Sequence, residues 1–261
     1  MLKITLFLLP VVMVSGMELE PFEGAFRSQY NYVKKKKNFV QNSHNASYQE
    51  MQFSYDIMLG LDHSVNLTSR FTKEDRKPYD YSAFSSTLKK SFFSQARGDF
   101  HSSWLSCSAC FVPSKWLKRP VYPYHHKING EVGCCFRKET PMRQKETIAI
   151  NLYSGLGISP LSSSWNRTKL SVAYGFDSRC FFDCEIDSYI GFGKNSWKEG
   201  EIFKGYAKLK HRSLNLNWTF TYLNTFSQGL FISLQRPIYE YSVMKRSFGF
   251  CIGLQLPFTP F

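Results

Sequence analysis

Ser154 and Asn166 are the residues of this chain whose types and spacing best suit chemistry. Residues 148–158 alternate in the period of a strand with one apolar face, and Ser154 lies on that face. A turn containing serines and Pro160 follows, and residues 164–176 begin a second alternating segment that carries Asn166 on the corresponding face. A hydroxyl and a carboxamide that meet on an apolar surface are either a chance pairing or a reaction centre. We expect both on the same face of an antiparallel pair.

The segment that carries Ser154 is one of a succession of roughly ten-residue alternating segments, the sequence pattern of a transmembrane β-barrel. No domain boundary, fixed-period repeat or low-complexity linker interrupts the succession, and aromatic residues make up 17% of the chain. The last segment ends in an aromatic residue, Phe258, and resembles the signal by which bacterial assembly machinery recognises outer-membrane barrels. The main predicted strands are residues 22–32, 51–59, 65–71, 128–136, 148–158, 168–176, 182–192, 214–222 and 248–258.

The predicted fold is all-β, an antiparallel transmembrane β-barrel of about twelve strands, in a range of about ten to fourteen. Having both termini on the periplasmic side requires an even number of strands, whereas the alternating segments number about thirteen. The excess segment is therefore expected between Tyr79 and Phe111 or near Leu230. Ser82 to Ser94 suits a helix or a loop as well as a strand.

The N-terminus predicts export. Lys3 precedes an apolar run that is too short to span a membrane as a helix and that ends in small residues, so residues 1–16 are predicted to be a signal peptide. Residues 17–261 then form one outer-membrane β-barrel domain, integral to a bacterial outer membrane. Three observations favour this barrel over a soluble β-sandwich: the export signal, the lack of a long apolar helix, and the apolar faces on nearly every strand.

The net charge of +13 would suggest nucleic acid in a cytosolic protein. In an exported protein it is expected to face anionic lipid head groups or surface polysaccharide phosphates, with no nucleic acid. The seven cysteines are an odd number, so cross-linked thiols and inert small apolar residues remain equal alternatives. Adjacent residues of a strand point to opposite faces, so Cys134 and Cys135 are not expected to bond each other.

Residues Asn151 to Arg167 resemble the motif of the outer-membrane phospholipase A family. That motif reads His-x-Ser-Asn-Gly, a loop, and Ser-x-Ser-Trp-Asn-Arg, and this chain aligns with it without a gap. The resemblance implies a barrel that hydrolyses acyl esters of membrane phospholipids on its lipid-facing wall, needs calcium and forms a homodimer. Ser154 falls on the nucleophile, Asn166 on the residue that orients the histidine, and Ser162 on a calcium ligand.

The chain departs from the motif at the catalytic base. Leu152 occupies the histidine position, and a serine hydroxyl is a poor nucleophile unless a base takes its proton. Hydrolysis is therefore expected to be lost or severely impaired. His126 is the candidate substitute base: a symmetric hairpin through Pro141 places it opposite Leu156, diagonal to Ser154, although a position at the rim of the barrel is the alternative.

Two other classes of function are alternatives to this phospholipase hypothesis. One is a non-enzymatic outer-membrane pore or structural barrel, in which residues of the lumen tune permeation and a lumen filled by paired charges would be closed. The other is a secreted eukaryotic β-sandwich with disulfides and glycosylation. The residues predicted to line the pore are Asp183, Glu185, Asp187, Lys204, Lys208 and Lys210.

Overall fold

The computed structural model describes residues 24–35, 47–60, 62–74, 77–119, 123–142, 146–160, 162–197, 203–224, 228–243 and 246–258. The predicted signal peptide, residues 1–16, and the first residues of the predicted barrel domain, 17–23, lie outside this part of the chain. No helix in the described ranges is long and apolar enough to cross a membrane.

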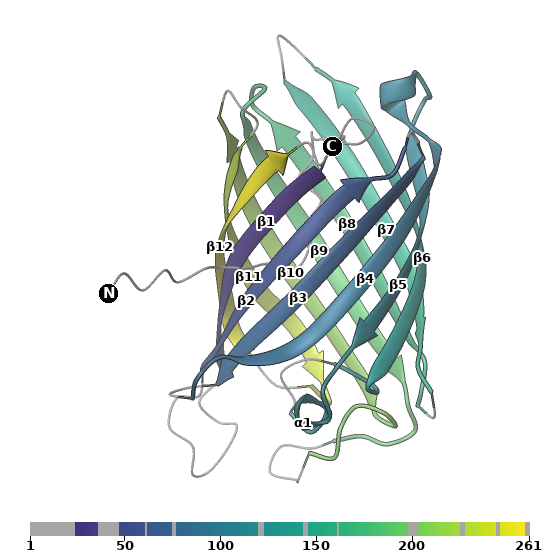
Figure 1. Ribbon diagram of the computed structural model, residues 1–261, viewed down its shortest axis with the longest axis vertical. Helices are drawn as coiled ribbons and strands as arrows, with labels where there is room; N and C mark the ends of the chain where they lie inside the picture. Colours follow the sequence, from purple (N-terminus) through teal and green to yellow (C-terminus); the bar gives the residue numbers. More distant parts are fainter. Residues whose placement is uncertain are drawn as a thin grey trace.

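Antiparallel strands form one closed barrel in which each strand pairs with the next in the chain and β1 pairs with β12 (Figure 1). The structure confirms the predicted all-β barrel and the predicted number of twelve strands. The strands are β1 (Gly24–Lys35), β2 (Ser47–Met58), β3 (His63–Glu74), β4 (Asp80–Phe93), β5 (Ser102–Phe111), β6 (Ile128–Pro141), β7 (Thr147–Ile158), β8 (Trp165–Gly175), β9 (Cys180–Phe192), β10 (Lys210–Leu223), β11 (Gly229–Tyr241) and β12 (Arg246–Phe258). In the described residues, two short helices, η2 (Gln95–Arg97) and α1 (Ser114–Leu117), lie in connections between strands.

The two ends of the barrel differ in the connections that they carry. β1 begins and β12 ends at the same end, uppermost in Figure 1. The connections at the opposite end include residues 112–127, which contain α1, and residues 193–209. Outer-membrane barrels have short periplasmic turns and longer extracellular loops, so the end with α1 is the extracellular end.

The distribution of side chains is the inverse of that in a soluble protein. Apolar side chains on the outer wall are exposed, for example Leu156 at 60% and Ile158 at 67%, while polar side chains of the lumen are buried. This arrangement suits a wall that meets lipid and a lumen lined by hydrogen-bonding groups. An aromatic ladder follows the outer wall from β1 to β4, with ring centroids 5.0 to 6.3 Å apart; its members are Phe26, Phe53, Tyr55, Phe71 and Tyr81.

One local prediction needs correction. Ser82 to Ser94, which suited a helix or a loop, lies almost entirely in strand β4. Its serines and its irregular alternation coincide with a break in register against β3 between Arg70 and Phe71, which disrupts the simple period of two.

The cysteines follow the parity of their strands. Cys134 is paired with Ser154 on the outer face and Cys135 with Tyr153 on the lumen face, so these neighbours point apart as predicted. All seven cysteines are free thiols in this structure.

Candidate functional site

The outer wall carries the serine that the sequence singled out. Ser154 lies on β7, opposite Cys134 of β6 and Thr168 of β8, and its side chain is exposed. Strand β7 ends at Ile158, so Ser154 lies near the extracellular end of the wall. The alternation of side chains along the strand predicts the outer face for Ser154, and the pairing of β7 with β6 and β8 confirms it.

Asn166 lies on the same outer face of β8, diagonal to Ser154. It is opposite Leu156, two residues beyond Ser154 on β7. Its amide nitrogen donates to the carbonyl oxygen of Gly155 at 3.0 Å, and its carboxamide oxygen accepts from the hydroxyl of Thr168 at 3.1 Å. These two bonds hold the carboxamide to a neighbouring backbone carbonyl and a hydroxyl group, and neither of them orients a base.

The register between β6 and β7 contradicts the expected position of His126. Val132, not His126, is opposite Leu156, and Cys134 is opposite Ser154. His126 lies in the connection before β6, where its carbonyl oxygen accepts from Asn129 at 2.6 Å. His126 precedes β6, and Cys134 lies roughly 20 Å along the strand from its first residue, Ile128, so the predicted hairpin register is wrong and His126 is out of reach of Ser154.

Ser162, the predicted calcium ligand, lies in the connection between β7 and β8. Its hydroxyl contacts the hydroxyl of Ser159 and donates to the carbonyl oxygen of Ser163 at 3.3 Å. Calcium takes six to eight oxygen ligands, commonly including carboxylates. The described residues contain no group of three or more His, Cys, Asp or Glu side chains that could hold a metal ion, so the calcium site remains a prediction without a ligand set.

Ion pairs along β8 and β9 form the main polar feature of the lumen. The guanidinium of Arg167 donates two hydrogen bonds to Asp187, at 2.9 and 3.2 Å. Two residues along the same strands, Lys169 donates to both oxygens of Glu185 at 3.1 Å, and Asn217 of β10 donates to Glu185 at 2.9 Å. A buried carboxylate needs such partners because desolvation without them is costly.

The ion pairs of the described strands follow the wall of the lumen, and none of them crosses its centre. Within the strands of the described chain, each ion pair joins residues of one strand or of two adjacent strands: Arg27 with Asp56, Arg137 with Glu139, Arg167 with Asp187, Lys169 with Glu185, and Arg246 with Glu240.

The lumen residues predicted from sequence divide into two groups. The acidic members on β9 face inward, as predicted. The lysines do not: Lys210 pairs with Phe192 on the outer face, and Lys204 and Lys208 are exposed in the connection between β9 and β10. That prediction was wrong for the lysines because they fall at or before the start of β10, where alternation does not yet apply.

Near the extracellular end, the carboxylate of Glu131 holds two aromatic side chains in the lumen. One oxygen accepts from the hydroxyl of Tyr153, and the other accepts from the indole nitrogen of Trp165 at 2.8 Å. The ring of Trp165 covers Gly157 so closely that a Cβ there would lie 1.7 Å from it. A glycine is thus required at this position for the indole to reach Glu131.

Residues 123–125 cross the mouth of the barrel. The hydroxyl of Tyr124 accepts from Arg70 of β3 at 3.2 Å, and the carbonyl oxygen of Pro123 accepts from the hydroxyl of Tyr189 of β9 at 3.2 Å. β3 and β9 are separated by five strands on either side of the closed barrel. This segment, the mouth strap, therefore links opposite walls.

His125 anchors the mouth strap to the wall. Its Nε2 lies 3.2 Å from Nε2 of His211 on β10, its ring stacks on Trp165 with centroids 4.4 Å apart, and its Nδ1 lies 3.5 Å from the hydroxyl of Ser163. Only 3% of His125 is exposed. Burial lowers the pKa of His125 to about 4 from its ordinary 6.5, so the imidazole is neutral at neutral pH.

The mouth strap was not predicted from the sequence, because a base for Ser154 was the only role considered for each histidine. The available signal was the run Tyr122 to His126, in which aromatic residues, a proline and two histidines precede a strand. Such a composition is unusual for a solvated loop and indicates that the side chains of this connection are buried.

Comparison with known proteins supports the fold and leaves the family open. No family model matches the chain, and no curated protein matches its sequence. An outer membrane channel from Pseudomonas putida F1 superposes with a TM-score of 0.58 at 10% identity, covering 95% of this chain and 100% of that one. The NanC porin superposes with a TM-score of 0.52 at 9% identity, covering 88% and 98%.

These likenesses, with the apolar outer wall and the polar lumen, identify an integral β-barrel of the bacterial outer membrane. They provide no support for the phospholipase A family specifically. That resemblance rests on the motif between Asn151 and Arg167.

Proposed function

We propose that this protein is a non-enzymatic outer-membrane channel for small polar solutes. The proposal rests on the distribution of the ionisable groups between the lumen and the outer wall. The lumen holds ion pairs that follow its wall, whereas the outer-wall serine has leucine at the position of its base and an alternative histidine out of reach. A charged lumen suits passage of polar solutes, and a serine without a base does not suit hydrolysis.

The mouth strap is the constriction of this channel. It spans the extracellular mouth through contacts with β3, β9 and β10, while the described ion pairs deeper in the barrel follow the wall. Permeation is therefore controlled at the mouth, and the deeper lumen sets charge selectivity. The similar structures include an outer membrane channel and a porin, which agrees with this proposal, although at about 10% identity they inform the fold alone.

Asp183 offers the cleanest test of charge selectivity. It faces the lumen on β9 between Ala173 and Thr219, and neither of its carboxylate oxygens has a hydrogen-bond partner among the described residues. Recorded at alkaline pH, where the buried carboxyl is ionised, Asp183→Asn removes a lumen charge without breaking an ion pair. Purified, refolded protein should give discrete conductance steps in planar bilayers, and this variant should lower the ratio of cation to anion permeability.

Lys90→Gln is the matched control, because Lys90 is exposed on the outer wall of β4. It changes the net charge by one unit outside the lumen and should leave the permeability ratio unchanged. Absence of conductance steps from folded protein at neutral and acidic pH would overturn the channel proposal. A permeability ratio that shifts equally in both variants would show that the lumen carboxylate does not face the permeating ions.

Ester hydrolysis is the second candidate function, favoured by the placement of Ser154 and Asn166 together on the outer wall near the extracellular end. Its calcium requirement through Ser162, its phospholipid substrate and a homodimer remain predictions, as does recognition by the assembly machinery. Assay of phospholipid hydrolysis in detergent with calcium tests this candidate: release of fatty acid by the wild type that Ser154→Ala abolishes would establish it.

A further inference from the structure

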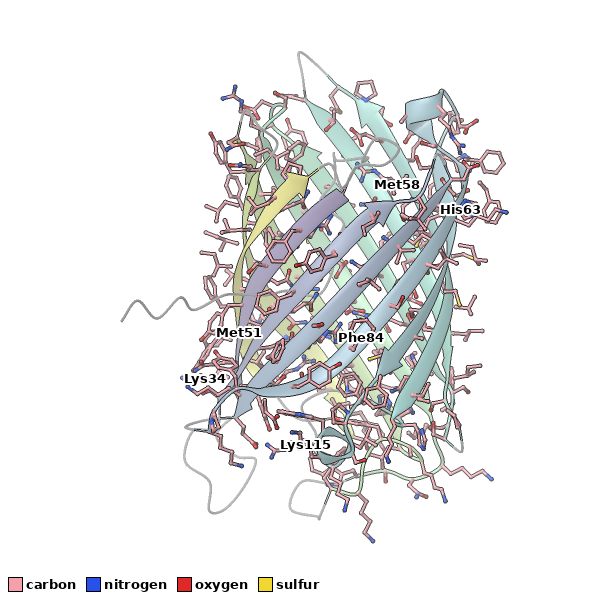
Figure 2. All side chains as sticks on the ribbon, in the orientation of Figure 1. Lys34, Met51, Met58, His63, Phe84 and Lys115 are labelled. Carbon is pink, nitrogen blue, oxygen red and sulfur yellow. The ribbon has the colours of Figure 1, made fainter. Side chains whose placement is uncertain are left out.

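Buried oxygen atoms without hydrogen-bond donors collect on one side of the lumen. Side-chain nitrogen and oxygen atoms lie mainly inside the barrel, while carbon atoms dominate its outer edges (Figure 2). On β7, β9 and β10 away from the mouth, the buried side-chain polar atoms that lack a partner in the described chain are all oxygens, and they belong to Asn151, Asp183 and Asn217. An acceptor that is removed from water without a donor costs free energy. This wall therefore has the composition of a site for a hydrogen-bond donor.

Asp183 is the centre of this oxygen cluster. Only 6% of it is exposed, and neither carboxylate oxygen has a hydrogen-bond partner of ordinary geometry among the described residues. The charged groups that act on it electrostatically are Glu185, Lys169 and Arg137. Lys169 donates to both oxygens of Glu185, and Arg137 pairs with Glu139. Asp183 is therefore a lumen carboxylate whose neighbouring cations are already matched by other carboxylates.

Asn217 presents the second oxygen of the site. Asp183 pairs with Thr219 of β10, so Asn217, two residues along that strand, is diagonal to Asp183 with Cα atoms roughly 7 to 8 Å apart. The amide nitrogen of Asn217 donates to Glu185 at 2.9 Å. An ionised carboxylate only accepts, so this bond fixes which end of the amide is the nitrogen. Its Oδ1 is then left as a buried acceptor without a donor.

The side chains that flank Asp183 on the neighbouring strands are mostly small or apolar. Ala173 of β8 pairs with Asp183, and Ala149 of β7 pairs with Ala173. Phe181, two residues before Asp183, is buried on the same lumen face of β9. The hydroxyl of Ser171 on β8 also faces Asp183 and, as a single donor, leaves most of the lone pairs of this carboxylate open. This lining suits a charged donor that is attached to aliphatic carbon.

We propose that Asp183 and Asn217 bind the primary ammonium group of a small aliphatic solute in the lumen. An ammonium group carries three donors and one positive charge, which match a carboxylate without a counter-ion and a free amide oxygen. Calcium, by contrast, takes six to eight oxygen ligands. The inference rests on the proposed channel function and names the class of solute that the lumen recognises, which is aliphatic primary amines.

Two ammonium ions of equal charge are the probes. Saturation-transfer NMR would measure the binding of n-butylammonium and of butyltrimethylammonium to folded protein in uncharged detergent. The measurement is made at about pH 8.5, where the Asp183 carboxyl is ionised and an alkylammonium keeps its proton. n-Butylammonium should bind about tenfold or more tightly, because the trimethylated ion keeps the charge but has no N–H to donate.

Three variants assign the binding to this site. Asp183→Asn should weaken the binding of n-butylammonium by about tenfold or more, because it removes the charged acceptor. Asn217→Ala should reduce the preference for the primary over the trimethylated ion. Asn66→Ala on β3 is the matched control, because the Asn66 nitrogen likewise donates to a lumen carboxylate, Asp56, at 2.8 Å, but its oxygen already accepts from Thr68 at 2.9 Å. This control should bind both ions as the wild type does.

The outcomes separate the ammonium site from the channel. Equal affinity for the two ions, undiminished binding by Asp183→Asn, or displacement of n-butylammonium by an equal concentration of sodium would overturn the site. Heat-modifiable migration checks folding, and if Asp183→Asn does not fold, equal effects of Asn217→Ala and Asn66→Ala would overturn it. A protein that conducts but shows no preference between the ions retains the channel and loses the site. A protein that shows this preference but does not conduct retains the site and loses the channel.

Discussion

Acidification is expected to release the mouth strap through His125. The imidazole is neutral and buried between Trp165 and His211 when the strap spans the mouth, and its pKa there is about 4. Released into water, the same side chain would regain a pKa near 6.5. The spanning state excludes the proton that the released state accepts, so it is fully favoured above pH 6.5 and progressively disfavoured as the pH falls from 6.5 towards 4.

The size of this effect follows from the difference between the two pKa values. That difference is about 2.5 units, and at 1.36 kcal/mol for each unit it amounts to about 3 kcal/mol, or roughly 300-fold in the equilibrium between spanning and released states. Protonation of His211 as well would add repulsion between two cations whose Nε2 atoms are 3.2 Å apart. The rings that pack against His211 from neighbouring elements are those of Tyr189 and Tyr206, with centroids 5.2 and 5.0 Å away.

Single-channel recording across acid pH measures the release. Open probability should rise as the pH is lowered from about 7 and should level off near about 4. His125→Phe keeps a ring against Trp165 but cannot take up a proton, so it should lose most of this rise. An open probability that does not change over this range, or a rise of the same size in His125→Phe, would refute the role of this imidazole.

Two further predictions concern β7. Leu152→His should raise phospholipid hydrolysis above that of the wild type in detergent with calcium, because it supplies a base on the face of Ser154. No gain, or a gain that survives Ser154→Ala, would count against the phospholipase hypothesis. Gly157→Ala should destabilise the barrel by about 1 to 3 kcal/mol, since its Cβ would displace Trp165 from Glu131. Gly130→Ala, whose Cβ would meet its nearest atom at 3.7 Å, should change the denaturation midpoint in detergent far less, and equal effects would contradict this reasoning.

The sequence predicts which face of each strand meets lipid, because side chains of a strand alternate and lipid tolerates few charges. That rule places Ser154 and Asn166 on the outer wall and Asp183, Glu185 and Asp187 in the lumen, where the structure has them. It fails where alternation is interrupted. β4 contains a break in register and a run of serines, and Lys210 stands at the very start of β10.

The sequence does not determine the pairing register of neighbouring strands, for a different reason. Parity is unchanged when a strand slips by two residues, so an alternating pattern does not distinguish registers that differ by two, four or six positions. The position of His126 depended on that choice. Cys134, which has no special pattern in the sequence, is the residue that faces Ser154 across the β6–β7 pair.

The sequence by itself determined a closed barrel with an apolar wall, because periodicity and the need to satisfy every backbone group in lipid leave few other folds. The tertiary structure decided what closes its mouth. Tyr124 and His125 contact β3, β8 and β10, strands far from them in the chain, and nothing in the local pattern encodes those distances. The closing of the barrel brings opposite walls within reach of one short connection. The burial of the His125 imidazole, and hence its neutral state, follows from those long-range contacts.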